Sequence, residues 1–294
     1  MRFSAIVTAY RRQEQILFTL RKLTECKPPP AEILVHVDGN QLATKEIIRC
    51  SFPLVKVLLS EDSVGPGGGR NKLIEMAENE VIASFDDDSY PIDSDYFSRI
   101  SDLFNRFPDA DILCSRVYHQ GEVIGPALQT AVWASDFSGG GCVYRRRAFA
   151  KTGGYVPITV AYGMEEVDLA IRLHAQGGKI LMTPWLRVFH DTDLGRHSKP
   201  EVTAGSIANI ALLTHLRYPP SCWWIGAAQC IRRIWWLVGH GRSRGVLQGL
   251  LMIPDHIRAY HRYQGRLPAV VIRSYLALRR NPVKAEFDRQ PTGC

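Results

Sequence analysis

The sequence predicts an α/β fold, in which a mostly parallel sheet carries helices on both faces and a helical extension follows. Apolar, β-rich segments alternate with segments of helical periodicity through the first half of the chain. Several predicted strands end in polar residues, and ligands collect at such strand ends in parallel sheets. After Ser198 the strand pattern stops, and apolar helical segments with many arginines follow.

Local patterns define the first strands and helix. Three segments are apolar and β-rich: Phe3–Ala9, Glu32–Val37 and Leu54–Leu59. Between the first two, Gln13–Thr24 repeats isoleucine and leucine at helical spacing, and the prolines at 28–30 end that helix. The second strand runs into Asp38-Gly39-Asn40, which is a turn signal.

A glycine-rich stretch, Gly65-Pro66-Gly67-Gly68-Gly69, precedes a predicted helix at Arg70–Glu78. We expect these glycines to form a flexible loop. The stretch lacks the G-x-x-x-x-G-K-[ST] spacing of a phosphate loop, so it does not indicate that type of nucleotide site.

Val81–Phe85 has the pattern of a buried strand, and it runs into three consecutive carboxylates, Asp86, Asp87 and Asp88. Adjacent like charges repel, so a fold keeps them together when a positive group lies beside them. A divalent metal ion that holds a diphosphate meets this need. An acidic turn closed by Tyr90-Pro91 is the alternative interpretation.

The alternation continues to residue 190. Helices are predicted at Asp95–Phe107 and Met164–Leu173, and strands at Asp111–Tyr118, Gly139–Tyr144, Lys179–Met182 and Leu186–Phe189. The glycines at 139–141 allow another group to approach the backbone closely. Glu165, Glu166 and Asp168 lie in the first turns of the second helix, where acids also complement the helix dipole. We interpret Asp168 as structural, because it lies inside the helix.

Taken in order, these motifs resemble those of the family 2 glycosyltransferases over about two thirds of the chain, from Arg2 to His190. The resemblance rests on the strands at 4–10 and 33–40, Gly69-Arg70-Asn71, Phe85–Asp88, Gly153-Gly154-Tyr155, Glu165–Leu169 and the late His190. Each motif alone is weakly specific, whereas the ordered series is strongly specific. The resemblance implies a GT-A fold, which is Rossmann-like, and transfer of a sugar from a nucleotide-diphosphate donor with inversion at the anomeric carbon.

For the nucleobase, the resemblance implies that Thr8 and Tyr10 line a pocket and that Asp38 accepts a hydrogen bond from a uracil or thymine imide. The donor is therefore expected to be a UDP- or dTDP-sugar. One departure from the family pattern lies here, because Val37 replaces the first acid of the usual strand-end pair. The base contact belongs to the second position, which is Asp38.

For the rest of the donor, the resemblance implies that Arg70 faces the nucleotide and that Asp86 and Asp87 lie near the ribose. Asp88 would bind a divalent metal ion, Mn²⁺ or Mg²⁺, on the diphosphate. Such an ion neutralises the charge that develops on the leaving group. His190 would be a second metal ligand, or alternatively an ordinary histidine at a strand end.

Glu166 is the expected general base, with Glu165 as the neighbouring candidate. The family has Glu-Asp before Val-Asp-Leu, whereas this chain has Glu165-Glu166, and the longer side chain changes the position of the base. A carboxylate within hydrogen-bond reach removes the acceptor proton as the hydroxyl attacks. One base and in-line attack give inversion in a single displacement.

The positive net charge belongs to the last third of the chain. Residues 1–198 contain 22 Lys and Arg against 25 Asp and Glu, whereas residues 199–294 contain 14 against 4. Such a segment indicates an acidic partner. Trp223-Trp224 and Trp235-Trp236 lie close to Arg232-Arg233, a combination typical of a membrane interface. We therefore expect an anionic membrane surface, and not nucleic acid, as a partner. A packed helical subdomain with a basic surface is the alternative.

A peripheral, cytoplasmic location on the inner face of the cell membrane follows as an expectation. The charge-free run Tyr218–Ile231 is too short to span a bilayer and contains Pro219-Pro220. The seven cysteines include no C-x-x-C pair, and the N-terminal apolar run is too short for a signal peptide.

The expected organisation is a catalytic domain over residues 1–198 and a basic, aromatic-rich helical extension over residues 199–294. Enzymes of the resembled family commonly build polysaccharides of the cell envelope on glycan or lipid-linked acceptors. Two other functions stay open. A sugar nucleotidyltransferase would need a glycine-rich, lysine-bearing loop after the first strand, and Arg11-Arg12-Gln13-Glu14 does not supply one. A catalytically inactive protein that binds nucleotide sugars is the other.

Overall fold

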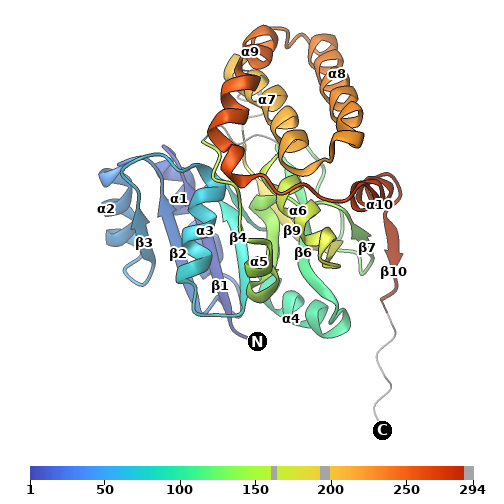
Figure 1. The fold of residues 1–294 in the computed structure, drawn as a ribbon. Helices are drawn as coiled ribbons and strands as arrows, with labels where there is room; N and C mark the ends of the chain where they lie inside the picture. The colour runs from blue at the N-terminus through green and yellow to red at the C-terminus, as the bar shows by residue number, and fades with distance from the viewer. Residues whose placement is uncertain (160–163, 193–198, 288–294) are drawn as a thin grey trace.

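Ten strands form one mixed sheet in the computed structural model, which describes residues 1–159, 164–192 and 199–287 (Figure 1). The strands are β1 (Phe3–Ala9), β2 (Glu32–Val37), β3 (Lys56–Leu59), β4 (Val81–Asp86), β5 (Ser89–Pro91), β6 (Ala110–His119), β7 (Ala131–Ala134), β8 (Cys142–Arg145), β9 (Lys179–His190) and β10 (Val283–Ala285). Their spatial order is β10-β7-β9-β6-β8-β4-β1-β2-β3, and β5 pairs with β9.

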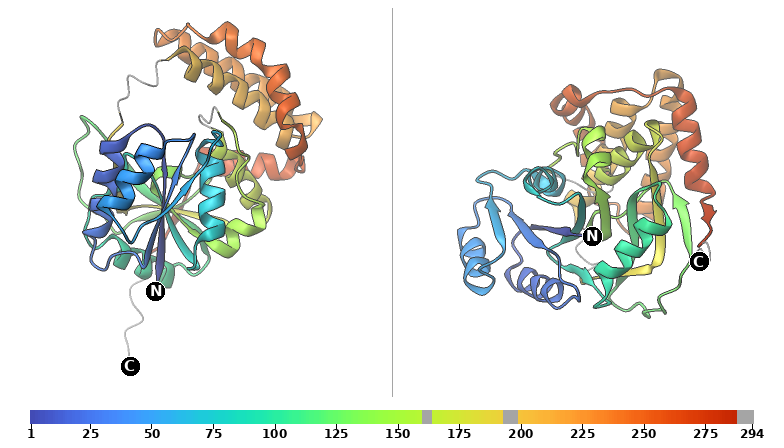
Figure 2. Two further views of the ribbon diagram at one scale, coloured as in Figure 1. Left: turned by 90° about the vertical axis from the view of Figure 1, so that its left-hand side faces the viewer. Right: turned by 90° about the horizontal axis from the view of Figure 1, so that it is seen from below.

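Helices cover both faces of this sheet (Figure 2). They are α1 (Gln13–Thr24), α2 (Leu42–Ser51), α3 (Gly65–Met76), α4 (Tyr96–Arg106), α5 (Arg146–Thr152), α6 (Glu165–Ala175), α7 (Pro200–Arg217), α8 (Trp223–Gly239), α9 (Val246–Tyr260) and α10 (Ala269–Arg280). Helices α1, α2 and α4 share one hydrophobic core with Val7 of β1. Helices α3, α5, α6 and α7 share the other core with Ile6, since successive strand residues point to opposite faces.

The parallel part of the sheet lies where the sequence predicts it. Strands β3, β2, β1 and β4 are parallel neighbours, so their carboxyl ends meet at one edge. The second half is mixed, because β8 runs antiparallel to both β4 and β6. A short 3-10 turn at Gly139–Gly141 precedes β8 and lies beside Asp86, at the carboxyl end of β4. Because β8 starts at this edge of the sheet, it runs away from it.

Several elements differ from the sequence predictions, and α5, β5, β7 and β10 were not predicted. The prediction of a flexible loop at Gly65–Gly69 is wrong, because α3 begins at Gly65. These glycines serve close packing instead, since a Cβ on Gly69 would lie 2.5 Å from Nδ1 of His36. Residues 179–190 form one strand rather than two, with a break in register against β6 after Thr183. Helix α2 was missed because few of its residues are buried.

The extension predicted for residues 199–294 is helical through α7, α8, α9 and α10. Its end also joins the sheet, where β10 pairs antiparallel with β7. No helix in the described ranges is both long and apolar enough to cross a bilayer. The predicted domain boundary at Ser198 falls on a residue outside those ranges.

A buried ion pair connects the extension to α6. Nε of Arg217, in the last turn of α7, lies 2.5 Å from Oδ1 of Asp168, and both side chains are buried. Arg172 pairs with the other oxygen of Asp168 at 2.6 Å. A buried carboxylate with two such partners is satisfied, whereas removing one partner would leave an uncompensated charge. Asp168 therefore has the structural position that its place within the helix predicts.

Candidate functional site

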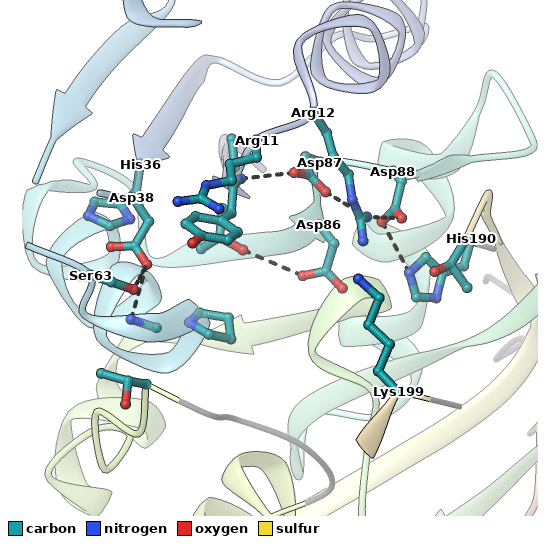
Figure 3. Close-up of a pocket in the computed structure, with 17 residues that line it drawn as sticks. Arg11, Arg12, His36, Asp38, Ser63, Asp86, Asp87, Asp88, His190 and Lys199 are labelled. Atoms are coloured by element: carbon teal, nitrogen blue, oxygen red, sulfur yellow. Dashed lines mark hydrogen bonds and ion pairs between the residues drawn. The ribbon is translucent and has the colours of Figure 1, made fainter. Parts of the chain in front are cut away.

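A cavity of about 720 Å³ opens at the carboxyl ends of β1, β2 and β4 (Figure 3). Its wall also includes the N-terminal turn of α3, the end of β9 and the residue before α7. Of the predicted site residues, seven line it: Thr8, Tyr10, Asp38, Asp86, Asp87, Asp88 and His190. The fold thus brings together side chains that are far apart in the sequence.

Asp38 lies at the end of β2 and holds the entry to α3. Its carboxylate accepts hydrogen bonds from Oγ of Ser63 at 2.7 Å and from the backbone N–H groups of Val64 at 2.8 Å and Gly65 at 3.2 Å. A carboxylate beside the first N–H groups of a helix also interacts favourably with the helix dipole. Asp38 is therefore fixed in orientation on the cavity wall.

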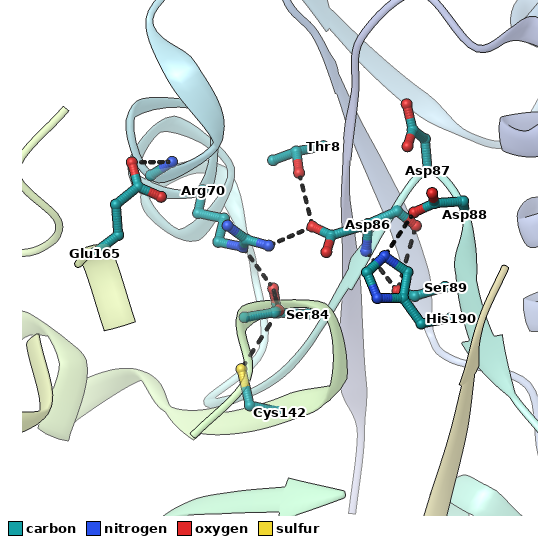
Figure 4. Close-up of polar contacts among 12 residues, drawn as sticks. Thr8, Arg70, Ser84, Asp86, Asp87, Asp88, Ser89, Cys142, Glu165 and His190 are labelled. Carbon is teal, nitrogen blue, oxygen red and sulfur yellow. Dashed lines mark hydrogen bonds and ion pairs between the residues drawn. The ribbon is translucent and has the colours of Figure 1, made fainter. Parts of the chain in front are cut away.

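Asp86 connects the cavity to a buried arginine (Figure 4). Oδ1 of Asp86 forms an ion pair with Nη2 of Arg70 and lies 3.5 Å from Oγ1 of Thr8. Nε of Arg70 donates to Oγ of Ser84 at 3.1 Å. Arg70 is almost fully buried and is not part of the cavity wall, so its visible contact is with Asp86 rather than with the cavity.

Asp87 is held from the end of β1. Its Oδ2 accepts a hydrogen bond from the backbone N–H of Tyr10 at 2.9 Å, and its Oδ1 lies 3.1 Å from Nη1 of Arg12. Burial raises the pKa of the Asp87 carboxyl to about 7, although Arg12 opposes that shift. The negative neighbours Asp88 and Asp86 add to it.

The side chains of Asp88 and His190 lie next to each other on the cavity wall. Nε2 of His190 lies 3.1 Å from Oδ1 of Asp88, and that buried oxygen receives no hydrogen bond within the described ranges. The other oxygen pairs with Arg12. Burial opposes ionisation of Asp88, yet His190 and Arg12 outweigh it and hold the pKa of this carboxyl below its usual value.

These two residues suit a divalent metal ion. The Asp88 oxygen and the His190 nitrogen that face each other at 3.1 Å are both atoms that bind metal ions in proteins. No group of three or more His, Cys, Asp or Glu side chains gathers at metal-binding geometry in the described part of the chain. A site with two protein ligands is still complete when substrate phosphates and waters supply the rest, as is usual for Mg²⁺.

The two candidate bases, Glu165 and Glu166, lie near Arg70 and do not line this cavity. Glu165 is buried and accepts a hydrogen bond from the backbone N–H of Gly67 at 3.2 Å. Glu166 is partly buried and lies against Gly139, where a Cβ would approach its Oε1 to 2.5 Å. Burial raises the pKa of both carboxyls, and nearby Arg70 opposes the shift.

The Gly139–Gly141 turn allows these groups to approach the backbone. A Cβ on Gly140 would lie 2.3 Å from Oδ2 of Asp86, and a Cβ on Gly139 would lie 2.9 Å from the guanidinium of Arg70. The backbone dihedrals here are accessible to other residues, so the lack of a side chain, rather than an unusual conformation, is what the turn requires.

Sequence reasoning missed seven polar residues on the cavity wall: Arg11, Arg12, His36, Ser63, Thr159, Thr192 and Lys199. Arg12 carries a usable signal, since it follows the first strand and that strand is the neighbour of the acidic one. Lys199 lies just before α7 and extends toward Asp86 in Figure 3. The position of Lys199 on the cavity wall depends on how the extension packs against the sheet, and no local sequence pattern reveals that packing.

Comparisons with known proteins concern the family and the fold. Residues 4–138 match the model of Glycosyl transferase family 2. No curated protein sequence matches the chain. Similar solved structures include GalNAc-T7 with UDP, GalNAc and Mn²⁺, at 14% identity and a TM-score of 0.60, covering 75% of this chain and 48% of that one. The present chain thus spans about half the length of that relative.

Two further structures cover more of the molecule. The mannosyltransferase PcManGT from Pyrobaculum calidifontis, in complex with GDP-Man and Mn²⁺, is 15% identical with a TM-score of 0.59, covering 94% of this chain and 79% of its own. S. aureus TarS 1-349 with UDP-GlcNAc is 15% identical with a TM-score of 0.55, covering 90% and 93%. At these identities the likeness shows the fold. The fold is GT-A, and the match to the model of glycosyl transferase family 2 covers residues 4–138, a little under half of the chain.

Proposed function

We propose that this protein is a metal-dependent, inverting glycosyltransferase that moves a sugar from a UDP- or dTDP-sugar to a hydroxyl of a glycan or lipid-linked acceptor. The observation that carries the proposal is the convergence of Asp38, Asp86–Asp88 and His190 on one cavity. The nucleotide sugars and Mn²⁺ in the similar structures support the same class of donor.

The nucleoside would lie along the β1 and β2 side of the cavity. Tyr10 is half exposed there and offers an aromatic face to a base, and Thr8 lies beside it. Asp38 would accept from the base imide, since a carboxylate oxygen can accept more than one hydrogen bond. Asp86 and Asp87 would contact the ribose.

The diphosphate would lie on the Asp88 side. Asp88 and His190 would hold Mn²⁺ or Mg²⁺, which supplies positive charge to the leaving diphosphate when bound. Arg12 and Lys199 add two cationic side chains to the same wall. Their charge would attract the donor and stabilise its phosphate oxygens.

Glu166 would be the general base. The acceptor oxygen forms a bond to the anomeric carbon while the bond from that carbon to the diphosphate breaks, and the acceptor proton passes to the Glu166 carboxylate. A raised pKa suits this role, because a stronger base removes the proton more readily. Arg70 would orient the site by pairing with Asp86 and lying beside Glu166.

The extension would hold the enzyme on the inner, cytoplasmic face of the cell membrane, in the synthesis of cell-envelope polysaccharide. Its basic charge would be attracted to anionic lipids. Nucleic acid is the competing acidic partner, and retention on DNA at low salt would identify it.

Calorimetry tests the donor site. UDP, TDP and GDP are titrated into the full chain with Mn²⁺, and again with EDTA. We expect UDP or TDP to bind at least tenfold more tightly with Mn²⁺, and Asp88→Asn to remove that difference. Equal affinity with and without the ion would refute the metal role.

Two other outcomes would favour the alternative functions. Binding of a nucleotide sugar without turnover of any acceptor would favour the inactive binding protein. Pyrophosphate-dependent release of a nucleoside triphosphate would favour the nucleotidyltransferase.

A further inference from the structure

The extension contains a second cavity, of about 440 Å³, between α8 and α9 where both helices pack on α7 (Figure 1). Close contacts set their positions. A Cβ on Gly226 of α8 would lie 2.1 Å from Oγ1 of Thr214, and a Cβ on Gly249 of α9 would lie 2.8 Å from the carbonyl oxygen of Ala204. Each helix is therefore held against α7, and the space between them is left open.

Apolar side chains dominate the wall of this cavity. They include Trp223, Ala227, Ile231 and Ile234 from α8 and Ile253 and Ile257 from α9. A cavity of this volume is within the range of small-molecule sites, which are mostly apolar. Such a lining favours a hydrocarbon chain over a sugar or a nucleotide, because it offers few hydrogen-bond partners.

An exposed apolar stripe lies next to the cavity. On α8, Trp224, Ile231 and Trp235 follow one another at intervals of seven and four residues and so share one helical face. Trp224 is 70% exposed and Trp235 is 76% exposed. Leu247 and Leu251 are similarly exposed on α9. An exposed apolar stripe such as the one on α8 marks a contact site.

Positive charge surrounds this stripe. Residues 223–260 contain five arginines and one acid, Asp255. Arg242 lies in the connection between α8 and α9, and its buried Nε and Nη2 have no hydrogen-bond partner within the described ranges. The connection itself touches the start of α7, since a Cβ on Gly245 would lie 2.2 Å from the carbonyl oxygen of Pro200. An anionic group at Arg242 would satisfy these donors.

We propose that the cavity between α8 and α9 binds the hydrocarbon chain of a phosphate-bearing lipid, with the phosphate near Arg242. The proposal deepens the membrane attachment described under the proposed function and rests on it, but it does not require glycosyl transfer. Ala211 on the cavity wall and Lys199 on the donor cavity are separated by about 18 Å along α7, at 1.5 Å per residue. The same helix therefore connects a lipid site with the donor site.

The test uses Ala227→Trp, which fills the cavity from an exposed position, and its neighbour Ala228→Trp as the matched control, because Ala228 is exposed and does not line the cavity. Binding of dodecyl phosphate below its micelle concentration is measured by calorimetry on the full chain. We expect Ala227→Trp to weaken binding at least tenfold and Ala228→Trp to change it less than twofold. Arg242→Gln should weaken dodecyl phosphate more than dodecanol.

Two further measurements distinguish a membrane lipid from free phosphate as the ligand of this cavity. With vesicles of phosphatidylcholine plus one third phosphatidylglycerol, Ala227→Trp should float less than the parent chain and Ala228→Trp should float about equally. Inorganic phosphate alone should not bind measurably. Equal binding of dodecyl phosphate by Ala227→Trp and the parent chain would overturn the proposal. So would a dimer, seen by sedimentation, that Ala227→Trp dissociates. UDP binding with Mn²⁺ is measured on the same samples, so that loss of the donor site is distinguished from loss of the lipid site.

Discussion

Nη1 of Arg12 lies 3.1 Å from Oδ1 of Asp87, so a residue after β1 supplies positive charge to the carboxylates at the end of β4. The same nitrogen pairs with Asp88. Arg12 thus supplies a cation to two of the three adjacent carboxylates, and the third, Asp86, pairs with Arg70. A metal ion bound at Asp88 would share that role with Arg12 rather than hold the cluster together alone.

Replacing Arg12 by Gln should therefore destabilise the fold. Asp87 and Asp88 are buried, and without the arginine their charges would be compensated less well. Arg12 is partly exposed, so we expect a loss of about 2 kcal/mol in the free energy of unfolding, below the full cost of breaking a buried pair. Mn²⁺ should restore part of the loss. Urea unfolding with and without Mn²⁺ measures both effects.

Arg11→Gln is the control, since Arg11 lies over the ring of Tyr10. Equal losses of unfolding free energy for the two variants would contradict this account.

His190→Ala should weaken metal binding without unfolding the protein. Nε2 of His190 lies 3.1 Å from Oδ1 of Asp88, so its removal should take away one of two protein ligands. We expect the Mn²⁺ concentration for half-maximal UDP binding to rise by about tenfold or more. His119→Ala provides the matched control, because the His119 ring packs 5.5 Å from the His190 ring. An unchanged Mn²⁺ titration in His190→Ala would make His190 a structural residue only.

Glu166→Gln should lower turnover by on the order of a hundredfold or more and leave UDP binding nearly intact. Glu166 lies beside Arg70 and Gly139, whereas Glu165 is buried and accepts from the backbone N–H of Gly67. Glu165→Gln should consequently affect the melting temperature more than the chemistry. Steady-state kinetics and thermal melts on both variants separate the roles. Full activity in Glu166→Gln with loss in Glu165→Gln would show that the base is the preceding residue.

Gly140→Ala should disturb Asp86. The added Cβ would lie 2.3 Å from Oδ2 of that side chain, so either the turn or the carboxylate must move. Overpacking of this kind costs about 1–3 kcal/mol, and the shift should also weaken UDP binding. Gly239→Ala is the control, because nothing lies within 4 Å of its added Cβ. Melting curves and UDP calorimetry check the two effects, and a Gly140→Ala protein with unchanged values for both would refute the close approach.

The sequence was a good guide wherever a property depends on neighbours along the chain. Apolar, β-rich runs located β1 and β2 to the residue, and the helical spacing of isoleucine and leucine located α1. The predicted polar residues account for seven of the seventeen residues that line the cavity. Their convergence follows from parallel pairing alone, since the carboxyl ends of β1, β2 and β4 meet at one edge.

Properties that depend on contacts across the fold were not accessible in this way. The glycines of α3 look like a loop in the sequence because glycine disfavours helices, but they are needed for packing against His36 and Glu165. The sequence predicts that Arg70 faces the nucleotide, and only the folded sheet shows that it is buried against Asp86. The return of β10 to the sheet edge likewise follows from the packing of the extension.

Burial lowers the pKa of His36 to about 4, and this shift makes a prediction for the dependence of stability on pH. The ring is buried beneath Gly69, its Nε2 lies 2.8 Å from Oγ of Ser60, and the charge of Lys72 also disfavours protonation, while Asp38 opposes the shift. An unfolded histidine has a pKa near 6.5. Between pH 6.5 and pH 4 the unfolded state therefore binds more protons than the folded state, and stability must fall as the pH is lowered through this range.

His36→Gln should remove this contribution, because glutamine can keep the hydrogen bond to Ser60 and does not titrate. Between pH 7 and pH 4.5 the parent chain should lose about 2–3 kcal/mol more unfolding free energy than the variant. Urea unfolding at the two pH values measures the difference, and His240→Gln, at an exposed position, should behave like the parent chain. If His36→Gln and the parent chain lose the same free energy on acidification, the buried His36 is not the group that responds. The acid sensitivity would then have to come from other groups.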